Sequence, residues 1–124
     1  MNLVDSSGWL EYLADGKNAG HFAAAIEKTD ELLVSAVNIY EVYKKLVLEK
    51  NENVALQVVG LMHQAKVIEV SSSIAVQAAR FSLEFKMPMA DSLIYATARM
   101  NDAIVLTQDA DFKGLEGVEY YKKM

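Results

Sequence analysis

Short apolar segments alternate with amphipathic segments along the whole chain, and this alternation constrains the fold more than any other feature of the sequence. Each apolar segment spans only three to five residues, which suits a strand and not a helix. Five strands are therefore predicted, at residues 2–4, 32–35, 66–70, 103–107 and 118–121. The segment 103–107 is the most apolar, as expected of a central buried strand, and 118–121 is expected at an edge of the sheet.

Helices are predicted between the strands. Apolar residues recur at helical spacing within the segments 9–16, 21–28, 38–50, 54–64, 74–85 and 88–101. Ser71 to Ser73 offer an N-cap for the fifth of these helices, and Pro88 favours the start of the sixth. Strands that alternate with helices predict an α/β fold, here a three-layer α/β/α sandwich around a mainly parallel sheet of four to five strands.

Size and composition limit the class of protein. A chain of 124 residues is expected to form one domain, residues 1–124. The longest apolar run, residues 22–26, is far shorter than the roughly 20 residues of a membrane-spanning helix, and Asp5 interrupts any signal-peptide pattern. We therefore expect a soluble cytoplasmic protein without a membrane anchor. The absence of cysteine excludes disulfides and thiol catalysis, and the net charge of −5 argues against a broad basic surface for nucleic acid.

Four acidic residues are predicted to meet at one edge of the sheet. In a parallel sheet, the carboxyl ends of the strands and the first turns of the following helices share an edge, and ligands bind there. Asp5 follows the first strand, and Asp109 lies two residues beyond the fourth. Glu41 and Asp91 fall in the first turns of their predicted helices. Other acids precede strands and are expected to be solvated at the opposite edge or in its loops: Asp30, Glu31, Asp102 and Glu116.

Each of the four acids also has a purely structural explanation. Glu41 follows Asn38 by three residues, the spacing of a capping box, so its side chain can reach back to the Asn38 amide. Asp5 can cap the first helix, and the helix dipole favours Asp91 in a first turn. The fourth acid can hold a turn with Asp111.

Four carboxylates at one edge nevertheless indicate a metal site when they are taken together. Like charges within about 4 to 6 Å raise one another's pKa and oppose folding, so such a cluster calls for a compensating cation. Carboxylate oxygen is the ligand type for hard divalent ions such as Mg²⁺ or Mn²⁺. His21 and His63 lie far apart and away from the strand ends, so we expect them outside this site.

Four short motifs contain these acids. They are Leu3-Val4-Asp5-Ser6-Ser7, Asn38-x-x-Glu41, Ala90-Asp91-x-Leu93-Ile94-x-Ala96-x-Ala98 and Thr107-x-Asp109-x-Asp111-Phe112. In order and spacing they resemble the motifs of PIN domains, and most closely those of the VapC-type toxins of toxin–antitoxin pairs. The resemblance covers essentially the whole chain, and the four motifs in register are far more specific than any one of them.

The resemblance implies a metal-dependent endoribonuclease that hydrolyses RNA phosphodiester bonds, with four carboxylates around Mg²⁺ or Mn²⁺: Asp5, Glu41, Asp91 and Asp109. Asp5 and Asp91 are expected as direct ligands, and Glu41 as a further ligand or as the general base. The hydroxyls of Ser6 and Thr107 match supporting positions, and Asp111 is the alternative to Asp109. The implied partners are an RNA substrate, a VapB-type antitoxin and a second copy of the chain in a homodimer.

Aromatic and basic side chains near the predicted site are candidates for contacts with other molecules. The helical spacing of Trp9, Tyr12, Tyr40 and Tyr43 favours packing in the core or at a subunit interface over stacking on bases. The basic residues available to an RNA backbone are Lys44, Lys45, Arg80, Lys86, Arg99 and Lys113. The alternative function is that of a PIN-fold protein with little catalytic activity that acts as a protein-interaction partner.

Overall fold

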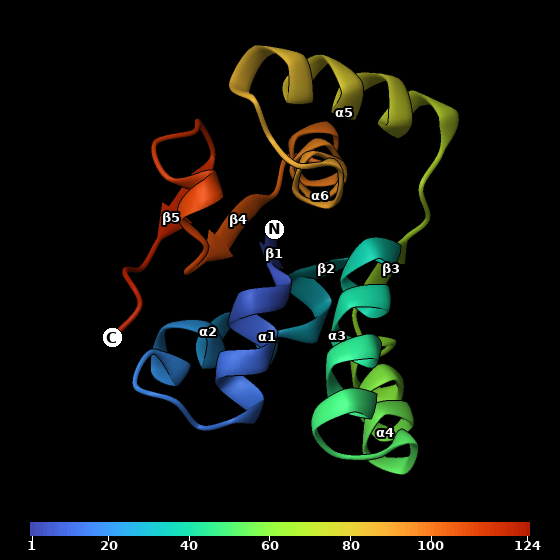
Figure 1. The fold of residues 1–124 in the computed structure, drawn as a ribbon, viewed down its shortest axis with the longest axis vertical. Helices are drawn as coiled ribbons and strands as arrows, with labels where there is room; N and C mark the ends of the chain where they lie inside the picture. The colour runs from blue at the N-terminus through green and yellow to red at the C-terminus, as the bar shows by residue number, and fades with distance from the viewer.

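Five parallel strands form the sheet in the computed structural model, which describes residues 1–124 (Figure 1). They are β1 (Asn2–Val4), β2 (Leu32–Ser35), β3 (Lys66–Ile68), β4 (Ile104–Thr107) and β5 (Val118–Tyr120). Their order is β3-β2-β1-β4-β5, and every neighbouring pair is parallel. The predicted α/β fold is confirmed, and so is the edge position of the last strand. β4 is an interior strand as expected, although the middle position belongs to β1.

Six helices connect and cover the strands: α1 (Ser6–Leu13), α2 (Ala19–Ile26), α3 (Ala36–Glu49), α4 (Glu52–Met62), α5 (Ser72–Phe85) and α6 (Met89–Met100). Two 3₁₀ turns, η1 (Thr29–Glu31) and η2 (Ala110–Phe112), precede β2 and follow β4. All six predicted helices are present, although α1 begins directly after its N-cap Asp5 and not near Trp9. None of these helices has both the length and the hydrophobicity that crossing a membrane requires.

The start of α3 differs from the prediction. Ser35 accepts a hydrogen bond from the Val37 N–H (3.1 Å), and the Asn38 side chain accepts one from the Ser35 N–H (3.0 Å). This reciprocal pair is a capping box that starts the helix at Ala36. The predicted capping pair of Asn38 with Glu41 is therefore wrong, and Glu41 lies in the second turn of α3, not in the first.

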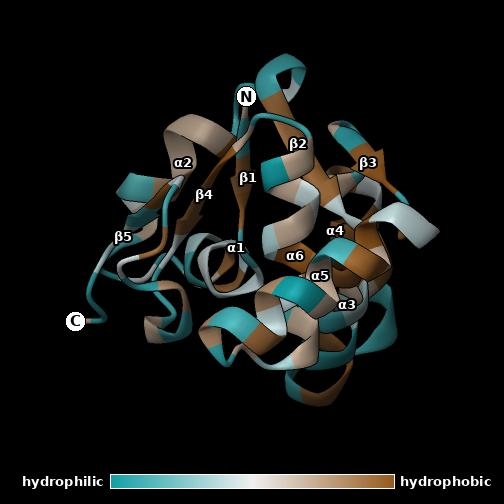
Figure 2. Ribbon diagram, turned by 90° about the horizontal axis from the view of Figure 1, so that it is seen from above, coloured by the Kyte–Doolittle hydropathy of each residue, from teal (hydrophilic) through white to brown (hydrophobic).

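Hydrophobic side chains pack on both faces of the sheet. Because successive residues of a strand point to opposite faces, Leu3 and Val4 enter different cores. Val4 packs with the buried Trp9 among residues of α1 to α4, whereas Leu3 packs with Tyr95 of α6. α5 packs mainly against α6, which lies between α5 and the sheet (Figure 1). The strands are largely hydrophobic (Figure 2). Trp9 thus belongs to the core as expected, but Tyr40 is 63% exposed, so core packing is wrong for Tyr40.

Gly8 determines how closely α1 approaches the sheet. A Cβ atom at this position would lie 2.6 Å from Val4 Cγ1 and 2.7 Å from Phe22 Cδ1. Both separations are shorter than two carbon atoms tolerate, so a larger residue would push α1 away from β1 and α2. The close approach matters for the site because Asp5 lies at the junction between β1 and α1.

Candidate metal centre

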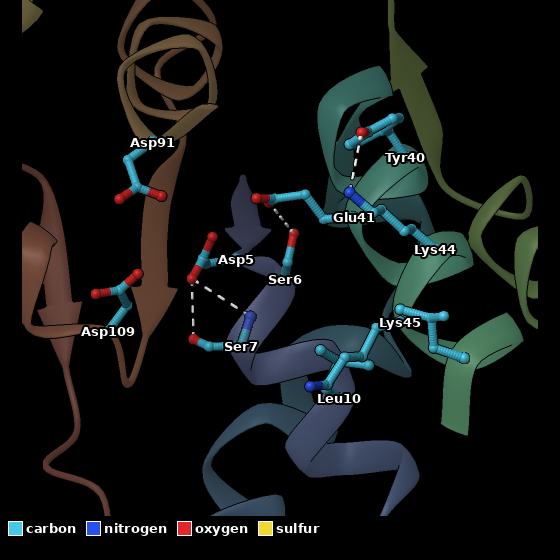
Figure 3. Close-up of a pocket in the computed structure, with 11 residues that line it drawn as sticks. Asp5, Ser6, Ser7, Leu10, Tyr40, Glu41, Lys44, Lys45, Asp91 and Asp109 are labelled. Atoms are coloured by element: carbon cyan, nitrogen blue, oxygen red, sulfur yellow. Dashed lines mark hydrogen bonds between the residues drawn. The ribbon is translucent and has the colours of Figure 1, made fainter. Parts of the chain in front are cut away.

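The four predicted acids line one cleft of about 380 Å³ at the carboxyl edge of the sheet (Figure 3). Asp5 follows β1 and caps α1, and Asp91 lies in the first turn of α6. Asp109 caps η2 just after β4, and Glu41 enters the cleft from α3. The structure therefore brings together carboxylates that are up to 104 positions apart in the sequence. Asp91 and Asp109 lie on one side of Asp5, and Glu41 lies on the other (Figure 3).

Asp5 is the most buried of these acids, with only 2% of its surface exposed. Its Oδ2 atom accepts hydrogen bonds from Ser7 Oγ (2.9 Å) and Thr107 Oγ1 (3.0 Å). Burial raises the pKa of Asp5 to about 6; the hydrogen bonds from Ser7 and Thr107 oppose this change, and the charge of Glu41 adds to it. At neutral pH this side chain is therefore a carboxylate held in a poorly solvated position.

Asp91 lies in the most negative part of the site. Burial is the main cause that raises its pKa to about 8, followed by a hydrogen bond with Asp111 and the charges of Asp109 and Asp5. One oxygen from each of Asp91, Asp109 and Asp111 lies within 4.8 Å of the other two. Asp109 and Asp111 are thus both next to Asp91, although only Asp109 lines the cleft.

No basic side chain forms an ion pair with an acid of this cluster. The two ion pairs of the structure join Lys45 to Glu49 and Arg99 to Glu116, and neither involves an acid of the cleft. Clustered oxygen donors with raised pKa values and no cationic partner are the chemistry that a hard divalent cation satisfies. The residues present therefore fit a hard divalent metal ion.

Asn38 organises the Glu41 side of the cleft. Its amide donates a hydrogen bond to Ser6 Oγ (3.0 Å), and Ser6 Oγ donates one to Glu41 Oε1 (2.7 Å). Asn38 is fully buried, and its own oxygen is held by the Ser35 N–H. Ser6 was predicted at the site, whereas Asn38 was predicted only as a helix cap. The fixed spacing of Asn38 and Glu41 was the available signal for its second role.

Thr107 connects two of the acids. Its hydroxyl donates to Asp5 Oδ2 and accepts a hydrogen bond from the Asp109 N–H (2.9 Å). Asp109 Oδ1 in turn accepts from the Asp111 N–H (2.9 Å), which is the turn that the sequence suggested. Ser7, which the sequence analysis did not single out, donates to Asp5 from the first turn of α1. The capping and turn contacts therefore also orient the carboxylates of the cleft.

The protein is thus an α/β domain with a parallel sheet. Acidic side chains from four separate segments form its candidate site at the carboxyl edge of this sheet. The chain belongs to the PIN domain family, whose model matches residues 3–118. A search of curated protein sequences gave no significant match.

Solved structures share this fold over nearly the whole chain. A chain of a toxin–antitoxin complex from Klebsiella pneumoniae is similar with a TM-score of 0.81 and 22% identity, and covers 99% of this chain and 100% of that one. VapC20 of Mycobacterium tuberculosis, described as a sarcin–ricin loop cleaving toxin, has a TM-score of 0.78 and 18% identity, with 96% and 98% covered. DNA-bound VapBC from Salmonella typhimurium has a TM-score of 0.74 and 14% identity, with 98% of each chain covered.

Proposed function

We propose that this protein is a metal-dependent endoribonuclease that acts in the cytoplasm as the toxin of a VapBC-type toxin–antitoxin pair. The observation that carries the proposal is the cleft with four carboxylates, two of which have raised pKa values, and no basic partner. Membership of the PIN family and the likeness to structures of toxin–antitoxin complexes support it.

When bound by these carboxylates, a divalent ion would draw electron density from the scissile phosphate and make the attacking water more acidic. Asp5, Asp91 and Asp109 would provide the oxygen ligands, with Asp111 next to Asp91 as a further donor. Thr107 and Ser7 hold the carboxylate of Asp5 in a fixed position. This preorganisation avoids reorienting the ligands during the reaction.

Glu41 has one oxygen fixed and one available. Its Oε1 atom accepts the hydrogen bond from Ser6, whereas no hydrogen bond of the structure involves Oε2. The free oxygen is available to complete the metal coordination or to accept the proton of the attacking water. Because Ser6 is itself held by Asn38, the position of Glu41 depends on both neighbours.

The proposed assembly is a homodimer that also binds a VapB-type antitoxin. Exposed apolar side chains on α5 and α6 support self-association, and they are Val76, Leu83, Phe85, Met89 and Met100. Leu83 and Met89 are the most exposed of these, at 84% and 77%. The antitoxin is proposed from the likeness to toxin–antitoxin complexes.

Cleavage of RNA by the purified protein tests the proposal. A structured and a single-stranded RNA are incubated with Mg²⁺ or Mn²⁺, with a chelator, and with the variant Asp91→Asn. Asp102→Asn is the matched control, because it makes the same chemical change at an exposed position before β4, at the other end of the strand. We expect metal-dependent cleavage by the wild type and the control, and none by Asp91→Asn.

Two results would contradict the nuclease assignment: cleavage that persists in Asp91→Asn, or a wild type that cleaves no RNA with either metal ion. In the second case the chain would be a PIN-fold interaction protein, which should retain its protein partner after the Asp91→Asn change.

A further inference from the structure

One side of the cleft is built from a single face of α3. Tyr40, Lys44 and Leu48 are spaced four residues apart, so they lie on the same side of the helix, and all three line the cleft. Tyr40 is 63% exposed and Leu48 is 77% exposed. Tyr40 directly precedes Glu41, and Figure 3 shows α3 across Asp5 from Asp91 and Asp109. A large aromatic ring is therefore uncovered beside the carboxylates.

Lys44 adds a positive charge beside this ring. Its ammonium nitrogen lies 5.6 Å from the centre of the Tyr40 ring and 3.5 Å from the Tyr40 hydroxyl. Lys45, the next residue, pairs with Glu49 at 3.1 Å, but Lys44 forms no ion pair. An unpaired cation next to an exposed aromatic ring matches the two contacts that a single nucleic-acid strand offers, a phosphate and the face of a base.

We propose that Tyr40 stacks on an unpaired base of the RNA while Lys44 pairs with a neighbouring phosphate, so that these two side chains of α3 hold the strand beside the carboxylates. The inference rests on the proposed ribonuclease function, and it names two residues of this chain that bind the RNA. Stacking on an aromatic side chain requires a base that has left its helix, and it tolerates many sequences because every base has a π face.

Lys44 offsets part of the negative charge of the cleft. The chain carries a net charge of −5, and the four cleft carboxylates account for −4 of it when ionised, so a phosphate approaching the cleft is repelled until cations compensate. Lys44 supplies one such charge on the side of the cleft where no metal ligand except Glu41 is predicted.

Binding and cleavage of one short RNA, single-stranded or annealed to its complement, test the inference. Binding is measured in the Asp91→Asn background so that the RNA stays intact, and 2-aminopurine is placed at each position in turn to report stacking. We expect Tyr40→Ala to raise the dissociation constant about tenfold to a hundredfold for the single strand, and Tyr40→Phe to restore it. The 2-aminopurine signal at one position should disappear with Tyr40→Ala and remain with Tyr40→Phe.

Salt dependence tests Lys44 separately. Lys44→Gln should reduce the slope of log K against log salt by about 0.7, the contribution of one phosphate contact in a single strand. Lys28→Gln is the matched control, because Lys28 is exposed and precedes β2, whereas the cleft lies at the carboxyl ends of the strands. The slope should not change in this control.

The variant Tyr40→Leu separates RNA stacking from an apolar docking surface for a protein. If Tyr40→Leu or Tyr40→Ala, added to Asp91→Asn, binds single-stranded RNA as tightly as Asp91→Asn alone, Tyr40 is not a stacking residue and the inference is overturned. If the wild type cleaves nothing but the Tyr40 variants change binding as expected, the nuclease proposal fails and the stacking inference stands. If the wild type cleaves RNA normally but binding is unchanged in the Tyr40 variants, the nuclease proposal stands and the stacking inference fails.

Discussion

Replacing Asp5 by asparagine should stabilise the metal-free protein at neutral pH although it removes a ligand of the proposed centre. Burial raises the pKa of Asp5 from 3.8 to about 6, and this change corresponds to about 3 kcal/mol. Asparagine has nearly the same shape, is a good N-cap for α1 and carries no charge. The variant therefore avoids the penalty of ionising a buried carboxyl group.

The sign of the pH dependence follows from the raised pKa. Between about pH 4 and pH 6 the folded protein holds the proton of Asp5 more tightly than the unfolded chain does. The contribution of Asp5 to stability is therefore complete below pH 4 and is lost as the pH rises through about 6. Relative to the wild type, Asp5→Asn should gain about 3 kcal/mol in the free energy of unfolding between pH 4 and pH 7.

Urea unfolding in the presence of a chelator, from pH 4 to pH 8, measures this difference. The difference between variant and wild type is taken at each pH. Acids that Asp5 does not contact titrate alike in both proteins, so their contributions to the free energy of unfolding cancel. Added Mn²⁺ should then stabilise the wild type and have a much smaller effect on the variant, because a ligand that binds only the folded state raises its stability. A difference that stays constant with pH, or that falls as the pH rises, would refute the burial argument.

Two further substitutions test the construction of the site. Thr107→Val removes the hydroxyl that joins Asp5 to the Asp109 N–H, so we expect RNA cleavage to fall about tenfold or more, whereas Thr107→Ser should retain most of it in the same assay. Gly8→Ala should lower the free energy of unfolding by about 1–3 kcal/mol, because its Cβ collides with side chains of β1 and α2. Gly20→Ala, in a helix with open space around this position, should be neutral or stabilising by up to about 1 kcal/mol. In urea unfolding, the midpoint of Gly8→Ala should therefore lie below that of Gly20→Ala.

The strands and the positions of three acids could be predicted because they depend on local pattern and simple topology. Short apolar runs give strands, and the carboxyl ends of parallel strands share one edge whatever their order. Asp5, Asp91 and Asp109 follow from that rule alone, and they line the same cleft.

The predictions of a cap for Asn38 with Glu41 and of core packing for Tyr40 were wrong because the local sequence pattern allows more than one arrangement of each side chain. Asn38 has the right spacing to cap a helix containing Glu41, but Ser35 provides the better cap and starts the helix two residues earlier. That change frees Asn38 to hold Ser6, a residue 32 positions away, which no local pattern reveals. Tyr40 shares helical spacing with core residues, yet Val42 and Leu46 already occupy the buried face of α3, so its ring remains outside.

The hydrogen bond between Asp5 and Thr107 joins residues 102 positions apart, and this distance along the chain has a consequence for synthesis on the ribosome. β1 lies in the middle of the sheet, but its partner β4 is translated only after about four fifths of the chain. A nascent chain therefore carries Asp5 and Ser7 from the start but lacks Thr107, the other hydroxyl that holds Asp5, until translation is nearly complete. An unfinished polypeptide therefore lacks the complete carboxylate centre on which the proposed ribonuclease activity depends.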